Sequence, residues 1–230
     1  MPDLTRLPER LHSVRHRIEA ACSRAGRDPS EITLIAVTKT FALDVLRAVL
    51  DAGIPDLGEN RALEFADKAD ALGDRARWHF IGSLQRNKAR EVAERADLFH
   101  ALDSVRLAKE LNKRARTAER VLSCLVQVNI SGEESKHGVE PSGLGALLEE
   151  VRRFEHLRIT GVMGMAAPAA PEDLDRLVRP QFARLRRLAD DLGREHLPHL
   201  SMGMSGDFEV AIEEGATHIR VGSALVGPRD

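Results

Sequence analysis

The sequence of 230 residues contains no tyrosine, one tryptophan and two cysteines. Cys22 falls in a helical pattern and Cys124 in a strand pattern, so we interpret both as small apolar core residues of a protein kept in a reducing compartment. Their placement indicates neither a disulfide nor a metal site. Long apolar runs are also missing, both of the length that spans a membrane and of the kind that marks a signal peptide. We therefore expect a cytoplasmic protein without a membrane partner.

An excess of charge of either sign is absent as well. The 34 lysines and arginines nearly balance the 36 aspartates and glutamates, which gives a formal net charge of −2. The two signs are interspersed, with no basic face and no acidic tail. Because nucleic-acid-binding domains generally carry a basic surface, the sequence predicts no nucleic-acid partner.

What the sequence does contain is a regular alternation of short β-branched runs with longer amphipathic ones. The predicted strands span residues 32–40, 54–57, 78–81, 98–102, 157–163, 200–202 and 218–221, and residues 121–130 contain a further long strand, the fifth in chain order. The predicted helices span residues 4–25, 43–52, 61–72, 85–96, 105–118, 142–154, 174–192 and 208–214. The alternative, an open doubly wound sheet, is disfavoured because no Gly-x-Gly-x-x-Gly turn follows the first strand. Since eight parallel βα units close into a barrel, we predict an α/β fold, a (β/α)8 TIM barrel that forms a single domain over residues 1–230.

The first predicted strand ends in a lysine. Residues 32–37 are almost all apolar or β-branched, which is typical of a strand buried on both faces of a parallel sheet, and Lys39 follows them closely. Ligands of such sheets bind beyond the carboxyl ends of the strands. Desolvation over an apolar floor leaves a lysine amine nucleophilic near neutral pH. The alternative is a solvated surface lysine that closes the strand.

Two loops near the end of the chain carry small residues. The sequence MGMSGD at 202–207 follows the seventh predicted strand, and RVGS at 220–223 follows the eighth. Barrels often bind phosphate with these two loops. Ser205 and Ser223 would add hydroxyl donors, and Gly222 would let an anion approach the backbone. Glycine and serine also form ordinary turns, so neither loop alone distinguishes a phosphate site from a turn.

The ends of the other strands bring further side chains to the same predicted mouth of the barrel. These residues are Asn60, Gly82, Ser83, Asp103, Asn129 and Met163. Strand alternation points His218 and Arg220 into the barrel, where a guanidinium keeps its proton and needs an acceptor. That acceptor is either a ligand or a structural carboxylate such as Glu59 or Glu209. His79, on the third strand, is either a proton shuttle or a buried histidine satisfied by hydrogen bonds.

A desolvated lysine, two phosphate loops and an inward arginine together suit pyridoxal 5′-phosphate. The chain also contains six ordered motifs: AVTK at 36–39, GENR at 58–61, HFIGSLQRNK at 79–88, VNISGEESKHG at 128–138, LSMGMS at 200–205 and VGSA at 221–224. Through these motifs the chain resembles, over essentially its whole length, the pyridoxal phosphate homeostasis protein family. Members of that family are barrel proteins related to the N-terminal domain of alanine racemase.

The resemblance implies that six residues hold the cofactor: Lys39, Asn60, Ser205, Arg220, Gly222 and Ser223. The lysine would carry pyridoxal phosphate as a Schiff base, and the two serines and the glycine would contact its phosphate. The arginine would lie by the pyridine nitrogen, and the asparagine would line the ring. The family has no established reaction, so the resemblance implies a carrier that serves homeostasis or delivery to apo pyridoxal-phosphate-dependent enzymes. We further expect a monomer.

The alternative is an enzyme similar to an amino-acid racemase. Racemisation needs an acid or base on each face of the substrate, and in the racemases that this fold resembles a lysine and a tyrosine serve these faces. This sequence has no tyrosine, and an arginine beside the ring nitrogen makes the ring a weaker electron sink, which favours the carrier. Lys136 is a candidate amine for cofactor release; otherwise it is a solvated lysine paired with Glu133 or Glu134.

Overall fold

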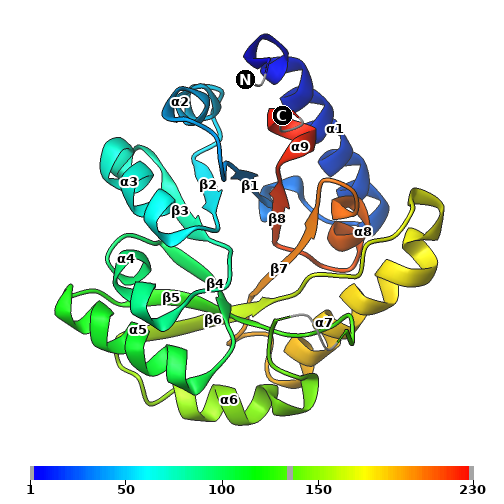
Figure 1. Ribbon diagram of the computed structural model, residues 1–230. Coiled ribbons are helices and arrows are strands. Elements are labelled where there is room, and N and C mark those ends of the chain that lie inside the picture. Colours follow the sequence, from blue (N-terminus) through cyan, green and yellow to red (C-terminus); the bar gives the residue numbers. More distant parts are fainter. Residues whose placement is uncertain (1–2, 134–136, 228–230) are drawn as a thin grey trace.

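The computed structural model describes residues 3–133 and 137–227 and contains a closed barrel of eight parallel strands with helices around it (Figure 1). The strands follow one another in chain order, and β1 pairs with β8 to close the ring. They are β1 (Thr33–Val37), β2 (Asp56–Glu59), β3 (Arg77–Phe80), β4 (Leu98–Leu102), β5 (Leu122–Gln127), β6 (Leu157–Met163), β7 (His199–Met204) and β8 (His218–Val221). The predicted TIM barrel is therefore confirmed.

The α-helices lie outside the strands. They are α1 (Leu7–Ala25), α2 (Leu43–Asp51), α3 (Ala62–Leu72), α4 (Ala89–Ala93), α5 (Val105–Thr117), α6 (Leu144–Val151), α7 (Arg179–Asp191), α8 (Phe208–Glu213) and α9 (Ser223–Val226). In α1, Leu7, Leu11, Val14 and Ile18 recur at spacings of three and four and are buried, as expected for a helix that packs one face on a core.

The large aromatic side chains fill the layer between strands and helices. Phe80 of β3 packs edge-on against Phe65 of α3, with the ring centroids 5.6 Å apart, and lies 6.0 Å from Phe99 of β4. Because successive residues of a strand point to opposite faces, the neighbouring His79 and His100 point into the barrel. The barrel interior therefore carries polar groups, while the outer layer is apolar.

Several predicted boundaries were wrong for identifiable reasons. The fifth strand lies within residues 121–130, as predicted, but it ends at Gln127 and so stops short of Asn129, which was expected at its end. The helix expected over 85–96 is a 3-10 turn (η4, Arg86–Lys88) followed by the short α4. The helix expected over 174–192 begins with a π-helical turn (η7, Leu174–Val178), and Pro180 stands in the first turn of α7. Since proline has no backbone N–H to continue the α-helical ladder, the two segments differ in pitch.

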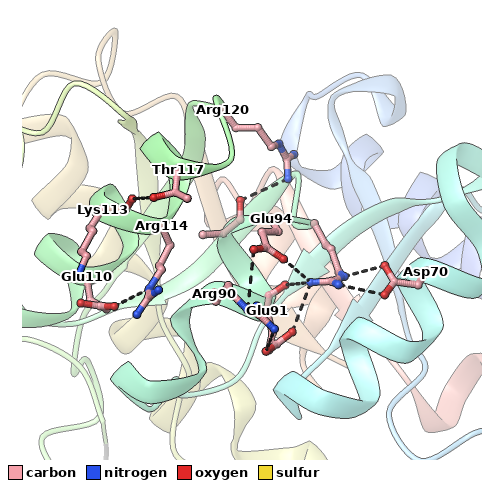
Figure 2. A network of polar contacts seen from close by, with 11 residues as sticks. Asp70, Arg90, Glu91, Glu94, Glu110, Lys113, Arg114, Thr117 and Arg120 are labelled. Carbon is pink, nitrogen blue, oxygen red and sulfur yellow. Dashed lines mark hydrogen bonds and ion pairs between the residues drawn. The ribbon is translucent and has the colours of Figure 1, made fainter.

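Polar contacts join the helices on the outside of the barrel. Figure 2 shows one such network, in which Asp70 of α3 and Glu94 after α4 both accept hydrogen bonds from Arg95. Within α5, Arg114 donates to Glu110. Exposed ion pairs of this kind contribute little to stability, about 0–1 kcal/mol each, so the apolar layer carries most of the packing.

Both ends of the described chain lie on one side of the barrel, where α1 runs beside α9 (Figure 1). Arg10 of α1 donates to the carbonyl oxygen of Val226 in α9 over 3.1 Å, which holds the last helix in place. Throughout residues 3–133 and 137–227, no helix combines the length and the hydropathy needed to cross a lipid bilayer.

Candidate functional site

A cavity of about 640 Å³ opens at the carboxyl ends of the strands. All six residues predicted from the sequence line it: Lys39, Asn60, Ser205, Arg220, Gly222 and Ser223. They come from four places in the chain, after β1, after β2, after β7 and on or after β8. The barrel therefore brings together residues that lie up to 184 positions apart, from Lys39 to Ser223.

The backbone on both sides of Lys39 is held by α3. Lys68 donates from its ammonium to the carbonyl oxygen of Thr38 over 2.9 Å, and Glu64 accepts the backbone N–H of Thr40. Thr40 has φ of 69°, a left-handed conformation that costs a β-branched residue roughly 1–3 kcal/mol. The Glu64 contact helps to keep this strained residue in place, so the backbone that carries Lys39 is held on both sides.

The same helix contributes a buried ion-pair cluster. The Lys68 ammonium contacts Glu59 at 2.8 Å and Glu64 at 2.6 Å, and Glu59 also accepts the Thr38 hydroxyl at 2.7 Å. Glu59 is fully buried, and this burial raises the pKa of its carboxyl even though Lys68 and Thr38 oppose the shift. Lys68 and Glu64 were not among the residues predicted from the sequence.

Backbone amides converge at the opposite wall of the cavity. The N–H groups of Gly222 and Ala224 both donate to the Ser205 hydroxyl oxygen, over 3.2 and 3.3 Å. The turn that presents Ser205 depends on Gly203, which has φ of +91° and at which an added Cβ would lie 2.6 Å from the Cβ of Ala211. Because the Ser205 oxygen accepts these two amides, its hydroxyl hydrogen remains to donate to an anion.

Asn60 occupies the wall between β2 and β3. The structure gives its buried Oδ1 atom no hydrogen-bond partner among the described residues. Gly82 packs directly against it, because a Cβ at this position would lie 2.5 Å from the Asn60 carbonyl oxygen. Buried polar atoms are nearly always paired in native proteins, so an unpaired amide oxygen at a cavity wall indicates a place for a ligand donor.

Arg220 points into the barrel, as predicted. Its guanidinium donates to the Ser201 hydroxyl over 2.6 Å and to the Gly164 carbonyl oxygen over 3.2 Å. Neither suggested carboxylate is its partner, because Glu59 pairs with Lys68 and Glu209 pairs with Arg17. Burial lowers the pKa of Arg220 to about 10, so the side chain stays charged at neutral pH.

His79 is a buried residue with hydrogen-bond partners on both ring nitrogens. Its Nδ1 lies 2.9 Å from Nε2 of His100, and its Nε2 lies 3.0 Å from Oδ1 of Asp56. His79 does not line the cavity in which Lys39 lies. These contacts agree with the interpretation of His79 as a buried histidine satisfied by hydrogen bonds, inside the barrel below the cavity.

Asp56 provides a test of this buried network. Although burial raises the pKa of its carboxyl, hydrogen bonds from His79 and Arg77 outweigh that effect and lower it to about 2. A folded-state pKa below the ordinary value of 3.8 stabilises the fold above that value, and the contribution is lost as the pH falls towards 2. We expect Asp56→Asn to lower the free energy of unfolding by about 2 kcal/mol at pH 7. Urea titrations should show this difference shrinking below pH 4, whereas a constant difference would mean that the substitution acts through packing.

Three residues expected at the mouth do not line the cavity: Asp103, Asn129 and Met163. Because β5 ends at Gln127, its last inward side chain is Gln127, which lines the cavity together with Met165 after β6. Asn129 instead donates to Glu140 over 3.1 Å. Lys136, the candidate release amine, lies outside the described residues.

Comparison with known proteins identifies the family. A model of the alanine racemase N-terminal domain matches residues 10–230. The pyridoxal phosphate homeostasis protein of Aquifex aeolicus is 46% identical over 226 residues, covering 96% of this chain and 97% of the relative. This chain belongs to the pyridoxal phosphate homeostasis protein family.

Further members of the family agree with this assignment. The protein of the same name from Pseudomonas aeruginosa is 41% identical over 228 residues, covering 99% of this chain and 97% of the relative. Among solved structures, PipY of Synechococcus elongatus with PLP bound has a TM-score of 0.81 and 33% identity, covering 96% of this chain and all of PipY. The family resemblance inferred from the motifs is therefore confirmed.

A pattern in the sequence does indicate the ion pair that Lys68 and Glu64 of α3 form. In the pattern of this helix, Phe65, Ala69 and Leu72 form the apolar stripe, and Lys68 lies three residues after the first and four before the last. A lysine on the buried face of a helix needs a buried partner. Glu64, four residues earlier, is the position from which a carboxylate reaches it.

Proposed function

We propose that this protein binds pyridoxal 5′-phosphate as a Schiff base on Lys39 and holds it inside the cell for delivery to apo enzymes. The observation that carries the proposal is the placement of Lys39 and the Ser205–Gly222–Ser223 wall in one cavity. Membership of the pyridoxal phosphate homeostasis protein family and the PLP-bound structure of the relative PipY support the choice of ligand.

The residues present fit this cofactor. The hydroxyls of Ser205 and Ser223 would donate to the phosphate. Arg220, a donor that keeps its proton, would face the pyridine nitrogen. The unpaired Oδ1 of Asn60 would accept a hydrogen bond from the ligand. When bound, pyridoxal phosphate supplies an aldehyde that condenses with an amine and a ring that withdraws electrons.

Arg220 favours a carrier over a racemase-like enzyme. Its partners are a hydroxyl and a backbone carbonyl, which occupy two of its five N–H donors, and with a pKa of about 10 it stays charged at neutral pH. A donor beside the pyridine nitrogen opposes protonation of that nitrogen, and the ring then stabilises a carbanion less well. The second acid or base that racemisation requires would also have to come from a residue other than tyrosine, which the sequence lacks.

Delivery is tested by mixing the loaded protein with an apo pyridoxal-phosphate-dependent enzyme. We expect the acceptor to regain activity while the loaded protein loses its visible absorption at the same rate. Free pyridoxal phosphate at the same concentration serves as the control. Both samples are also measured with a phosphatase that destroys only the unbound cofactor. Complete loss of transfer in the presence of the phosphatase would argue against direct delivery.

The cavity wall formed by Ser205, Gly222 and Ser223, here called the phosphate wall, is tested by the substitution Ser205→Ala. The substitution removes one hydroxyl donor to the phosphate and the common acceptor of the Gly222 and Ala224 amides. Because a hydrogen bond to a charged group contributes about 1.5–3 kcal/mol, we expect the dissociation constant for pyridoxal phosphate to rise roughly 10- to 100-fold. Pyridoxal, which has no phosphate, is the matched control ligand, and its binding should not change. An equal loss for both ligands would place Ser205 away from the phosphate.

A further inference from the structure

A chain of hydrogen-bonded side chains crosses the inside of the barrel below the cavity. It begins at Arg220 on β8, whose guanidinium lies 2.6 Å from the Ser201 hydroxyl on β7. Ser201 Oγ lies 2.9 Å from Nδ1 of His100 on β4, and His100 Nε2 lies 2.9 Å from Nδ1 of His79 on β3. His79 Nε2 lies 3.0 Å from Asp56 at the start of β2. The chain thus connects the cavity with the opposite end of the barrel.

The members of the chain are shielded from solvent. Ser201 and His100 have no exposed surface, and Arg220, His79 and Asp56 are at most 5% exposed. An unpaired donor or acceptor in such a place costs about 1–3 kcal/mol. Each donor and acceptor of the chain therefore needs a hydrogen-bond partner among the neighbouring groups inside the barrel.

When each imidazole carries one hydrogen, the Asp56 end of the chain sets the direction of the hydrogen bonds between the side chains. A guanidinium only donates, so Ser201 Oγ accepts from Arg220, and its own hydrogen remains available to an unprotonated His100 Nδ1. His100 then carries its hydrogen on Nε2 and donates to His79 Nδ1. His79 in turn carries its hydrogen on Nε2 and donates to Asp56, a carboxylate that only accepts. In this order four contacts receive four hydrogens, and each imidazole uses one ring nitrogen as donor and the other as acceptor.

The charged and titratable groups around the chain favour a neutral His100. Burial, together with the neighbouring histidines and Arg220, lowers the pKa of His100 well below its ordinary value. The rings of His199 and His218 pack beside the chain, His218 at 6.2 Å from both His79 and His100. The remaining charges that face these groups are Arg77 and Asp97 at the Asp56 end, Arg194 near His199 and Asp207 near Arg220.

We propose that Asp56, His79, His100 and Ser201 are positioning residues that hold the Arg220 guanidinium in one orientation at the cavity floor. The inference about the cofactor rests on the proposed function, whereas the order of the hydrogen bonds belongs to the protein alone. Ser201 acts as the last link, because its hydroxyl oxygen accepts from Arg220 while its hydrogen is donated to His100, which orients the hydroxyl. The state of the imidazoles is thereby transmitted to the residue that faces the ligand.

The order of the chain is tested in the protein without cofactor by NMR of ¹⁵N-labelled histidine. We expect His79 and His100 both to carry their hydrogen on Nε2 and to have an unprotonated Nδ1 at pH 7. A His100 with its hydrogen on Nδ1, or a doubly protonated His79, would reverse the chain and overturn the proposal. This measurement needs no ligand, so it stands even if pyridoxal phosphate proves not to bind.

The positioning role is tested by Ser201→Ala, with Thr217→Val as the matched control. Thr217 also places a hydroxyl against a core histidine, 2.8 Å from Nδ1 of His218, but outside the chain. Ser201→Ala should alter the His100 ¹⁵N signals without cofactor and shift the visible absorption maximum of the bound cofactor, while borohydride traps the same amount of adduct. Thr217→Val should leave all three unchanged. Unaltered His100 signals and absorption in Ser201→Ala, or equal shifts in both variants, would refute the positioning role.

Discussion

Replacing Lys39 with alanine is expected to abolish the borohydride-reduced adduct with pyridoxal phosphate. A Schiff base requires an amine whose carbon chain can reach the aldehyde, and Lys39 is the lysine that lines the cavity. Lys68, the lysine nearest along the chain, is engaged by Thr38, Glu59 and Glu64. Reduction of the wild type followed by peptide mass mapping should place the adduct on the peptide that contains Thr38, Lys39 and Thr40.

The exposed Lys113 on α5 provides a matched control for this experiment. Lys113→Ala should keep the full adduct, because free surface lysines react only at random with excess aldehyde. Non-covalent binding to Lys39→Ala should persist more weakly, since the phosphate wall is intact. An adduct that survives in Lys39→Ala, or that maps to Lys68, would contradict the assignment.

Lys68→Met is expected to produce the largest loss of stability in this region. Removing one partner of a buried ion pair typically costs about 3–5 kcal/mol, because the other charge stays buried without compensation. Glu59 is that other charge, with a fully buried side chain. The same substitution frees the Thr38 carbonyl next to Lys39. Urea denaturation should therefore show a lower free energy of unfolding, and borohydride trapping on Lys39 should decrease.

The pH dependence identifies the cause of this loss. Burial holds the pKa of Glu59 above its ordinary value, so its contribution to stability is greatest at low pH and is lost as the pH rises through the folded-state pKa. Without Lys68 that pKa rises further, and the variant should be destabilised more at pH 8 than at pH 5.

Two controls complete the Lys68 experiment. Lys113→Met makes the same change on an exposed position of α5 and should alter stability by at most about 0.5 kcal/mol. The double variant Lys68→Met/Glu59→Gln removes both charges and should recover part of the lost stability and most of the pH dependence. A Lys68→Met protein as stable as the wild type at pH 8 would contradict the stabilising role of the Lys68 contacts with Glu59 and the Thr38 carbonyl.

Local patterns in the sequence determined the strands, the helices and the order in which they alternate. The apolar side chains of β1 need cover on both faces, which is typical of a strand in a parallel sheet. Lys39 follows this apolar run and therefore lies at the carboxyl edge of the sheet. The small residues Gly203, Ser205, Gly206, Gly222 and Ser223 likewise marked two loops that line the cavity. These inferences depend on periodicity and on the two faces of a strand, which neighbouring residues alone specify.

Only the tertiary structure decided which of these side chains meet. His100 and Ser201 are 101 positions apart, and their contact depends on closure of the barrel through the pairing of β1 with β8. The end of β5 at Gln127 likewise decided that Gln127, and not Asn129, faces the cavity. The sequence pattern repeats every two residues along a strand, so it assigns a face but neither a register nor an opposite neighbour. Those follow from the packing of eight strands around one axis, which also places Lys68 of α3 beneath the backbone of Lys39.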